Sequence, residues 1–226
     1  MSKNIFGITN FDNNRIYYEG FSIKIKSLLR NILKQNEKLG MMMKVIDSNE
    51  VNKVLTSFLP AEHVKNIFEI TPEKLKEKGI KAIITDLDNT LVEWDRPSAT
   101  PRLIEWFEEM KKNHILVAIV SNNQKERVRL FAEPLNIPFI YQARKPMTRA
   151  FYRAITVLNV KKEETVVIGD QLLTDVFGGN RAGFHTILVV PVAQSDGFFT
   201  RFNRMVERRL LKFFKKKGYI QWEDRS

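Results

Sequence analysis

Five short apolar segments recur between residues 82 and 190, and the interval after each of the first four is long enough for a helix. They are Ala82–Thr85, Ile115–Val120, Phe139–Tyr141, Thr165–Ile168 and Thr186–Val190. Short apolar runs of this kind are typical of strands that are buried on both faces. Strands that alternate with helices form parallel sheets with right-handed crossovers. We therefore predict an α/β fold built on a doubly wound, Rossmann-like parallel sheet of five strands.

Helix-start signals mark several of the segments around these strands. Thr71 and Thr100 are candidate N-caps, each followed by a proline at the first helical position, and Gly79 ends the earlier helix. We expect a further helix to run from Phe58 through Phe68. Helical spacing predicts that two helices pack on the sheet, one through Leu103, Phe107 and Met110 and one through Met147, Phe151, Ile155 and Leu158.

The chain of 226 residues divides by composition into four parts. Residues 1–42 form a leader without a clear structural pattern, 43–80 a helical lead-in, 81–197 the α/β core and 198–226 a basic C-terminal segment. Met41, Met42 and Met43 are consecutive, so translation that begins there would make the leader non-native; mapping the native N-terminus would decide. Residues 198–226 carry nine basic and three acidic side chains, whereas residues 61–197 carry nineteen and eighteen.

Composition excludes several classes of chemistry. The chain has no cysteine, which removes disulfides, thiolate nucleophiles and cysteine-ligated zinc, and its three histidines are scattered. Any metal must therefore be bound by oxygen atoms. No apolar run approaches the length of a membrane span, and no secretory signal pattern opens the chain. We expect a cytoplasmic protein.

Two carboxylates follow the first predicted strand at its carboxyl end, where open α/β sheets bind ligands. They are Asp86 and Asp88, within Asp-Leu-Asp-Asn-Thr-Leu. Taken alone, this pattern fits a catalytic pair, a turn capped by its own side chains, or a clamp for a metal and a sugar phosphate. An EF-hand loop is disfavoured because the required Asp/Asn alternation fails at Thr90.

Polar residues also follow the next three predicted strands. Ser121-Asn122-Asn123 outlines a phosphate cradle and equally fits a helix cap. Lys145 precedes a proline and is either a solvated charge or a phosphate ligand. The fourth strand ends in Gly-Asp-Gln-Leu-Leu-Thr-Asp, which contains Asp170 and Asp175. Parallel strands present their carboxyl ends at one edge of a sheet, so these groups are expected to meet there.

The ordered set Asp-x-Asp, Ser, Lys and Gly-Asp-x-x-x-x-Asp resembles the haloacid dehalogenase (HAD) superfamily of aspartate-based phosphatases, over Lys81 to about Val192. The resemblance implies that Asp86 is the nucleophile and Asp88 the general acid/base. It implies that Ser121 and Lys145 bind phosphate, and we add their neighbour Asn122 and Thr90 as phosphate-binding candidates. Mg²⁺ is the implied cofactor, with metal-site residues Asp86, Asp88, Asp170 and Asp175, of which Asp88 contributes its carbonyl.

The spacing between motifs leaves no room for an inserted cap domain. Asp88 and Ser121 are 33 positions apart, and Ser121 and Lys145 are 24 apart. We therefore expect an open pocket that admits a phosphate presented on a surface. Asp-Leu-Asp-Asn-Thr-Leu-Val-Glu-Trp-Asp and Gly-Asp-Gln-Leu-Leu-Thr-Asp-Val look like the capless subclass IIIA group of YqeG type, which is similar to mitochondrial phosphatidylglycerophosphate phosphatases. That similarity implies a lipid headgroup as substrate.

The C-terminal segment predicts a helix with an apolar and a cationic side. Its apolar residues are Phe199, Phe202, Val206, Leu210 and Phe213; its cations are Arg201, Arg204, Arg208, Lys212 and Lys215, offset by about 200° around a helix. The helix either docks on the core or holds the enzyme at the inner face of an anionic membrane through residues 198–217. Other substrates, a soluble or macromolecular phosphomonoester, stay open, as does an RNA- or ribosome-binding role for a phosphatase-like domain. Gly178–Gly183 lacks the spacing of a dinucleotide-binding motif and fits a helix-ending turn.

Overall fold

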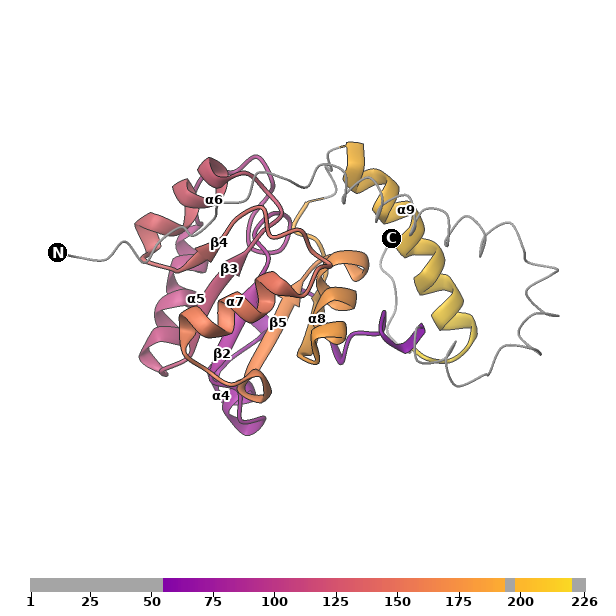
Figure 1. Cartoon of the computed structure of the whole chain (residues 1–226), viewed down its shortest axis with the longest axis horizontal. Helices are drawn as coiled ribbons and strands as arrows, with labels where there is room; N and C mark the ends of the chain where they lie inside the picture. Colours follow the sequence, from indigo (N-terminus) through magenta and orange to yellow (C-terminus); the bar gives the residue numbers. More distant parts are fainter. Residues whose placement is uncertain (1–54, 194–197, 221–226) are drawn as a thin grey trace. The chain divides into compact units, whose positions relative to one another are not determined.

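A computed structural model describes residues 55–193 and 198–220 (Figure 1). Within them lies one sheet of six parallel strands in the order β1-β6-β5-β2-β3-β4. The strands are β1 (Glu62–Val64), β2 (Ala82–Thr85), β3 (Leu116–Val120), β4 (Phe139–Ile140), β5 (Thr165–Gly169) and β6 (His185–Val189). From β2 the chain first builds outward to β4 and then returns to β5, so the strand order reverses between β2 and β5. Ligands of doubly wound sheets bind at such a switch point.

Helices cover both faces of this sheet. They are α4 (Pro72–Glu77), α5 (Pro101–Lys112), α6 (Lys125–Ala132), α7 (Arg149–Leu158), α8 (Phe177–Ala182) and α9 (Phe198–Lys216), with 3-10 helices η1 (Ile67–Glu69), η2 (Glu133–Leu135) and η3 (Lys162–Glu164) and a π-helix η4 (Leu172–Val176). Side chains of α4, α5 and α6 share one buried cluster with Ile83, and those of α7 and α8 share another with Ile84. Successive residues of a strand point to opposite faces, so the strands β2, β3, β4 and β5 each contribute to both clusters.

All five predicted strands are present, and the sixth replaces part of a predicted helix. The helix expected from Phe58 through Phe68 is wrong: β1 pairs with β6 through Val64 and Val189, and only η1 is helical beyond it. The backbone N–H of Ala61 also donates to the carbonyl of Thr186, 3.0 Å away. Pairing with the edge of the sheet determined this segment, because three residues are too few to show a period of two.

The predicted helix starts at Thr71 and Thr100 are confirmed. Each threonine side chain accepts a hydrogen bond from a backbone N–H in the first turn, and a proline follows each cap. Gly79 ends the earlier helix segment with a φ of +70°, which a residue without Cβ adopts readily. Met147, by contrast, lies before the start of α7 and is 39% exposed. The apolar side of that helix is therefore shorter than its spacing predicts.

The glycine-rich segment after the site is a packed helix followed by a turn. Gly178 and Gly179 lie inside α8, where a Cβ on Gly179 would come within 2.6 Å of Thr186 Cγ2. The turn itself is at Gly183, with a φ of +78°. The two earlier glycines thus allow α8 to lie close to the sheet, which corrects the expectation that the whole segment is a helix-ending turn.

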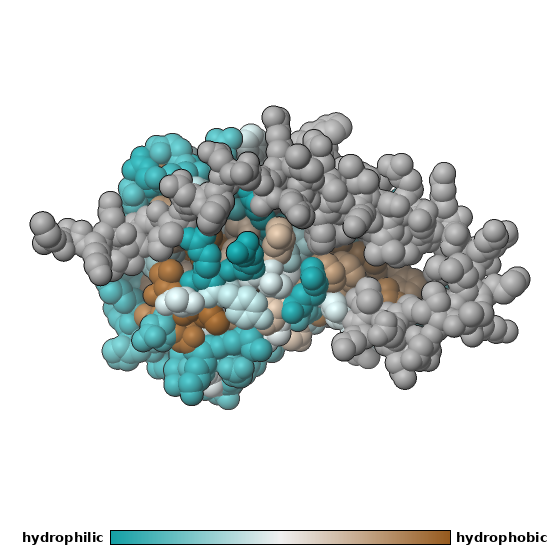
Figure 2. Space-filling model, viewed as in Figure 1, coloured by the Kyte–Doolittle hydropathy of each residue, from teal (hydrophilic) through white to brown (hydrophobic). Residues whose placement is uncertain are grey.

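The intervals between the motifs hold only the elements of the sheet and its helices. Residues 88–145 are described throughout and contain α5, β3, α6, η2 and β4, with no inserted cap domain. Across the described ranges, no helix has the length and apolar content needed to span a membrane. The face in Figure 2 is largely hydrophilic over its described residues, with smaller hydrophobic patches.

Candidate active site

The carboxyl ends of β2 through β5 bring the predicted residues together. Asp86 follows β2, and its backbone N–H donates to the carbonyl of Ile168 in β5 (2.9 Å). Thr90 Oγ1 donates to Asp170 Oδ1 (3.0 Å) and lies 3.5 Å from Asp86 Oδ2. Lys145, after β4, reaches Asp86 Oδ1 at 2.5 Å. The predicted convergence of these strand ends is present in the fold.

Lys145 is a buried cation between two carboxylates. Its side chain is 3% exposed, and Nζ lies 2.5 Å from Asp86 Oδ1 and 2.6 Å from Asp175 Oδ1. Burial acts to lower the pKa of Lys145, but attraction to Asp175 and Asp86 outweighs burial and raises that pKa above its usual range. Lys145 is therefore an ammonium at neutral pH, not the solvated surface charge that its sequence context also allowed.

Three carboxylates form an oxygen-rich cluster around this lysine. Asp86, Asp170 and Asp175 each present a carboxylate oxygen within 4.8 Å of the others. Three carboxylates and one ammonium leave two formal negative charges in a buried site, which is unfavourable without a further cation. An all-oxygen donor set suits a hard divalent ion such as Mg²⁺. The cluster thus fits the implied cofactor in both ligand type and charge.

Asp175 is held by the geometry of η4. Its Oδ2 accepts a hydrogen bond from the backbone N–H of Gln171 (3.2 Å), while Oδ1 faces Lys145. A Cβ on Gly169 would lie 2.2 Å from Asp175 Cγ, so only glycine leaves room for this carboxylate. Burial raises the pKa of Asp175, and the negative charge of Asp86 adds to this shift, whereas Lys145 opposes it. The carboxylate is therefore fixed in place at an electrostatic cost.

Asp88 occupies a different environment from the cluster. Asn123 Nδ2 donates to Asp88 Oδ2 (2.9 Å), and Arg127 Nη2 lies 2.8 Å from Oδ1. Burial raises the pKa of Asp88 and Asp86 adds to this, whereas Asn123 and Arg127 act in the opposite direction. The net shift is upward, which favours a carboxyl group that carries a proton more readily than an exposed aspartate does.

Asn123 and Arg127 are site residues that the sequence analysis missed. Arg127 lies on α6, 39 residues after Asp88, and no motif connects the two. Asn123 and Arg127 are four positions apart at the start of α6, and residues four apart share a helix face. This spacing was the sequence signal that the two side chains could contact the same group.

Ser121 and Asn122 shape the loop after β3. Ser121 is 2% exposed and its Oγ accepts from the backbone N–H of Asn123 (3.1 Å). Asn122 Oδ1 accepts from the backbone N–H of Lys145 (2.7 Å), and its Nδ2 donates to the carbonyl of the same residue (3.3 Å). Asn122 thus holds the backbone of Lys145, and its assignment as a phosphate ligand stays a prediction.

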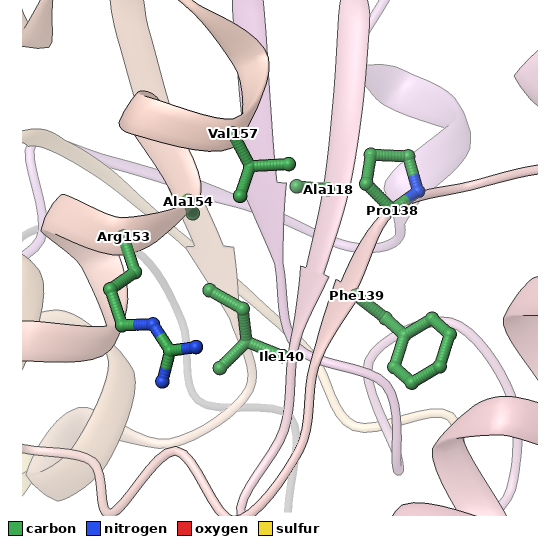
Figure 3. A pocket seen from close by; sticks show the side chains of 7 residues that line it. All are labelled: Ala118, Pro138, Phe139, Ile140, Arg153, Ala154 and Val157. Atoms are coloured by element: carbon green, nitrogen blue, oxygen red, sulfur yellow. The ribbon is translucent and has the colours of Figure 1, made fainter. Parts of the chain in front are cut away.

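A small pocket elsewhere on the core is separate from this cluster. Figure 3 shows its lining, which is apolar apart from Arg153, between α7 and the β3–β4 region. The lining residues are Ala118, Pro138, Phe139, Ile140, Arg153, Ala154 and Val157. None of the predicted site residues belongs to it, and the chemistry of the chain lies at the strand ends instead.

Two sequence-family models and several known proteins match this chain. The sequence model of the HAD-hydrolase-like family matches residues 142–191, and that of a family of proteins of unknown function, DUF705, matches residues 8–139. "Probable phosphatase YqeG" of Bacillus subtilis is 74% identical over 167 residues, which cover 74% of this chain and 97% of that protein.

The similarity extends to more distant proteins. Phosphatidylglycerophosphate phosphatase 1, chloroplastic/mitochondrial, of Arabidopsis thaliana is 30% identical over 178 residues, which cover 71% of this chain and 49% of that protein. A solved cobalt-bound deoxy-D-mannose-octulosonate 8-phosphate phosphatase from Haemophilus influenzae is 19% identical, covering 64% of this chain and 92% of its own, with a TM-score of 0.44. The family models and the Bacillus subtilis relative together identify this chain as a phosphatase of the HAD-like superfamily, in the family of YqeG.

Proposed function

We propose that this phosphatase hydrolyses phosphomonoesters through an aspartyl-phosphate on Asp86 with the help of Mg²⁺, and that its substrate is phosphatidylglycerophosphate. One observation carries the catalytic part. Asp86 ends the central strand β2, within 2.5 Å of the ammonium of Lys145 and beside the carboxylates of Asp170 and Asp175. A nucleophile, a charge-stabilising donor and a set of oxygen ligands therefore meet at one point.

The two carboxylates of the first motif divide the chemistry. An oxygen of Asp86 attacks phosphorus as the bond from phosphorus to the leaving oxygen breaks, which splits hydrolysis into two easier steps. Asp88 gives its proton to the departing alkoxide. It then takes a proton from the water that attacks phosphorus, and this second attack releases inorganic phosphate and restores Asp86. The raised pKa of Asp88 suits the first of these two roles.

The remaining groups bind and orient. Lys145 and Ser121 stabilise the oxygens of the transferring phosphoryl group, and Thr90 and Asn122 are supporting candidates at the same edge. Asp86, Asp170 and the carbonyl of Asp88 would hold Mg²⁺, with Asp175 beside them. When bound, the ion would reduce the repulsion between an anionic nucleophile and an anionic phosphate.

Three features support a lipid headgroup as substrate. The site has no inserted cap, so a phosphate can reach it from a surface. Of the residues with described side chains in α9 and its following turn, Arg208, Arg209, Lys212 and 215–217 are exposed cations. Such a set favours peripheral contact with an anionic membrane, at about 1 kcal/mol per cation before screening. The Arabidopsis thaliana relative carries the name of a phosphatidylglycerophosphate phosphatase.

Phosphate release tests the proposal. The panel contains phosphatidylglycerophosphate in mixed micelles and soluble phosphomonoesters, with the parent protein and Asp86→Asn. Asp95→Asn, which makes the same change at an exposed position, is the matched control. We expect Mg²⁺-dependent release from the lipid that Asp86→Asn abolishes and Asp95→Asn preserves. Activity that survives in Asp86→Asn contradicts the mechanism, and release from soluble esters alone contradicts the lipid assignment.

A further inference from the structure

The C-terminal helix α9 buries an acidic side chain against the element that carries Asp175. Glu207 is 4% exposed, and its Oε1 accepts a hydrogen bond from the backbone N–H of Leu173 in η4 (3.2 Å). Among the described residues of α9 it is the only acid. A buried carboxylate needs such a partner, and a contact of this kind is charge-assisted.

Apolar packing accompanies this hydrogen bond. Leu211, one helical turn after Glu207, packs against Leu172 and Val176 of η4 and Leu188 of β6. The side of α9 that meets η4 therefore contains positions 207 and 211, shifted by one from the predicted apolar positions 206 and 210. The exposed cations at 208, 209 and 212 lie outside this contact.

The hydrogen bond lies at the start of η4, where backbone N–H groups have no carbonyl partner within the helix. The first N–H groups of a helix have no carbonyl one turn before them, so they need acceptors from elsewhere. In η4, the side chain of Asp175 satisfies the N–H of Gln171, and Glu207 satisfies that of Leu173. Two carboxylates thus cap the same π-helical turn, one from within it and one from α9.

We propose that Glu207 is a positioning residue for Asp175, which makes α9 part of the catalytic unit. By fixing the first turn of η4, Glu207 keeps the Asp175 carboxylate between Lys145 and the N–H of Gln171. Loss of the acceptor frees this turn, and Asp175 then presents its oxygens less well to Lys145 and to a divalent cation. The inference rests on the proposed function for its catalytic consequence, whereas its structural and cation-binding consequences do not.

Three variants of the full chain test the proposal. Glu207→Ala removes the acceptor, Glu207→Gln keeps an oxygen that accepts the same hydrogen bond, and Glu108→Ala makes the same change at an exposed position on α5. Amide hydrogen exchange of residues 172–176, Mg²⁺ affinity by calorimetry, and kcat and KM for p-nitrophenyl phosphate are measured for each. For Glu207→Ala we expect faster exchange in 172–176, weaker Mg²⁺ binding, and a kcat about 10- to 100-fold lower with little change in KM. Glu207→Gln and Glu108→Ala should stay close to the parent.

Several results would overturn this assignment. Exchange and Mg²⁺ affinity that are the same in Glu207→Ala as in Glu108→Ala would show that the contact positions nothing. Equal acceleration of exchange in 172–176 and in β5 would show a general stabilising role, as would failure of Glu207→Gln to restore Mg²⁺ affinity. If the parent itself hydrolyses no phosphomonoester, the proposed function fails, and exchange and Mg²⁺ affinity still judge the role of Glu207.

Discussion

Replacing Lys145 by methionine tests whether one ammonium balances the carboxylates of the site. The change keeps a long, unbranched side chain in a position that is 3% exposed, and it removes the charge that contacts Asp86 and Asp175. Breaking a buried ion pair by removing one partner costs about 3–5 kcal/mol in free energy of unfolding. Part of this loss is recovered here, because burial already raises the pKa of Asp175 and that group takes up a proton when Lys145 is absent. We expect a net loss of about 3 kcal/mol.

Chemical denaturation with and without Mg²⁺ measures this loss, and phosphate release measures the catalytic effect. The loss of one positioned donor lowers kcat by about 100-fold or more. Lys112→Met makes the same change at an exposed position on α5 and should alter neither quantity. Mg²⁺ should stabilise Lys145→Met more than it stabilises the parent, since the ion can displace the proton that Asp175 takes up and then meets no ammonium that repels it. A variant as stable as the parent in EDTA, or one equally active, would refute the view that Lys145 balances this cluster.

The remaining predictions address the other charged groups. Arg127→Gln removes a group that lowers the pKa of Asp88, so Asp88 should stay protonated to higher pH and the alkaline limb of the kcat/KM profile should move to higher pH. The control Arg129→Gln, on the same helix, should leave that limb in place. A move of the limb to lower pH in Arg127→Gln would contradict the assignment. Gly169→Ala places a Cβ 2.2 Å from Asp175 Cγ, so Mg²⁺ affinity should fall about 10-fold or more by calorimetry; an unchanged affinity would show that Asp175 does not contribute. Because the folded state raises the pKa of Asp175, that group favours folding most below pH 3.8, and this stability is lost as pH rises through the folded-state pKa. The Mg²⁺-dependent rise in Tm should therefore be larger at pH 7 than at pH 5, and a rise that is independent of pH would argue against carboxylate ligands.

The strand ends were predictable because two simple patterns coincide in them. A buried parallel strand shows as a short apolar run, and a charged residue soon after it lies at the edge of the sheet where ligands bind. Asp86, Asp170 and Lys145 could all be found in this way, and the fold places them together. Each residue also had a structural interpretation, as a helix cap or as a surface charge. The prediction therefore depended on the order of these residues along the chain.

Other parts of the fold depend on contacts that no local pattern encodes. The strand β1 has three residues and exists through its pairing with β6, which lies over 120 residues away in sequence. Arg127 reaches Asp88 only because α6 packs beside the loop after β2. Glu207 belongs to no motif of the sequence, and it is buried because it accepts a hydrogen bond from the N–H of Leu173 at the start of η4. In each case a tertiary partner outweighs the local signal.

The two aspartates of the first motif show how neighbours in sequence acquire different chemistry. Asp86 contacts the ammonium of Lys145 and lies among oxygen atoms that suit a divalent cation. Asp88, two residues later, leaves this cluster and is largely buried beside Asn123 and Arg127, with its pKa raised. The backbone turns directly after Asp88, at Asn89, which has a φ of +64°. A nucleophile must be ionised and a general acid must carry a proton. One short motif can supply both only if its two carboxyl groups lie in different environments.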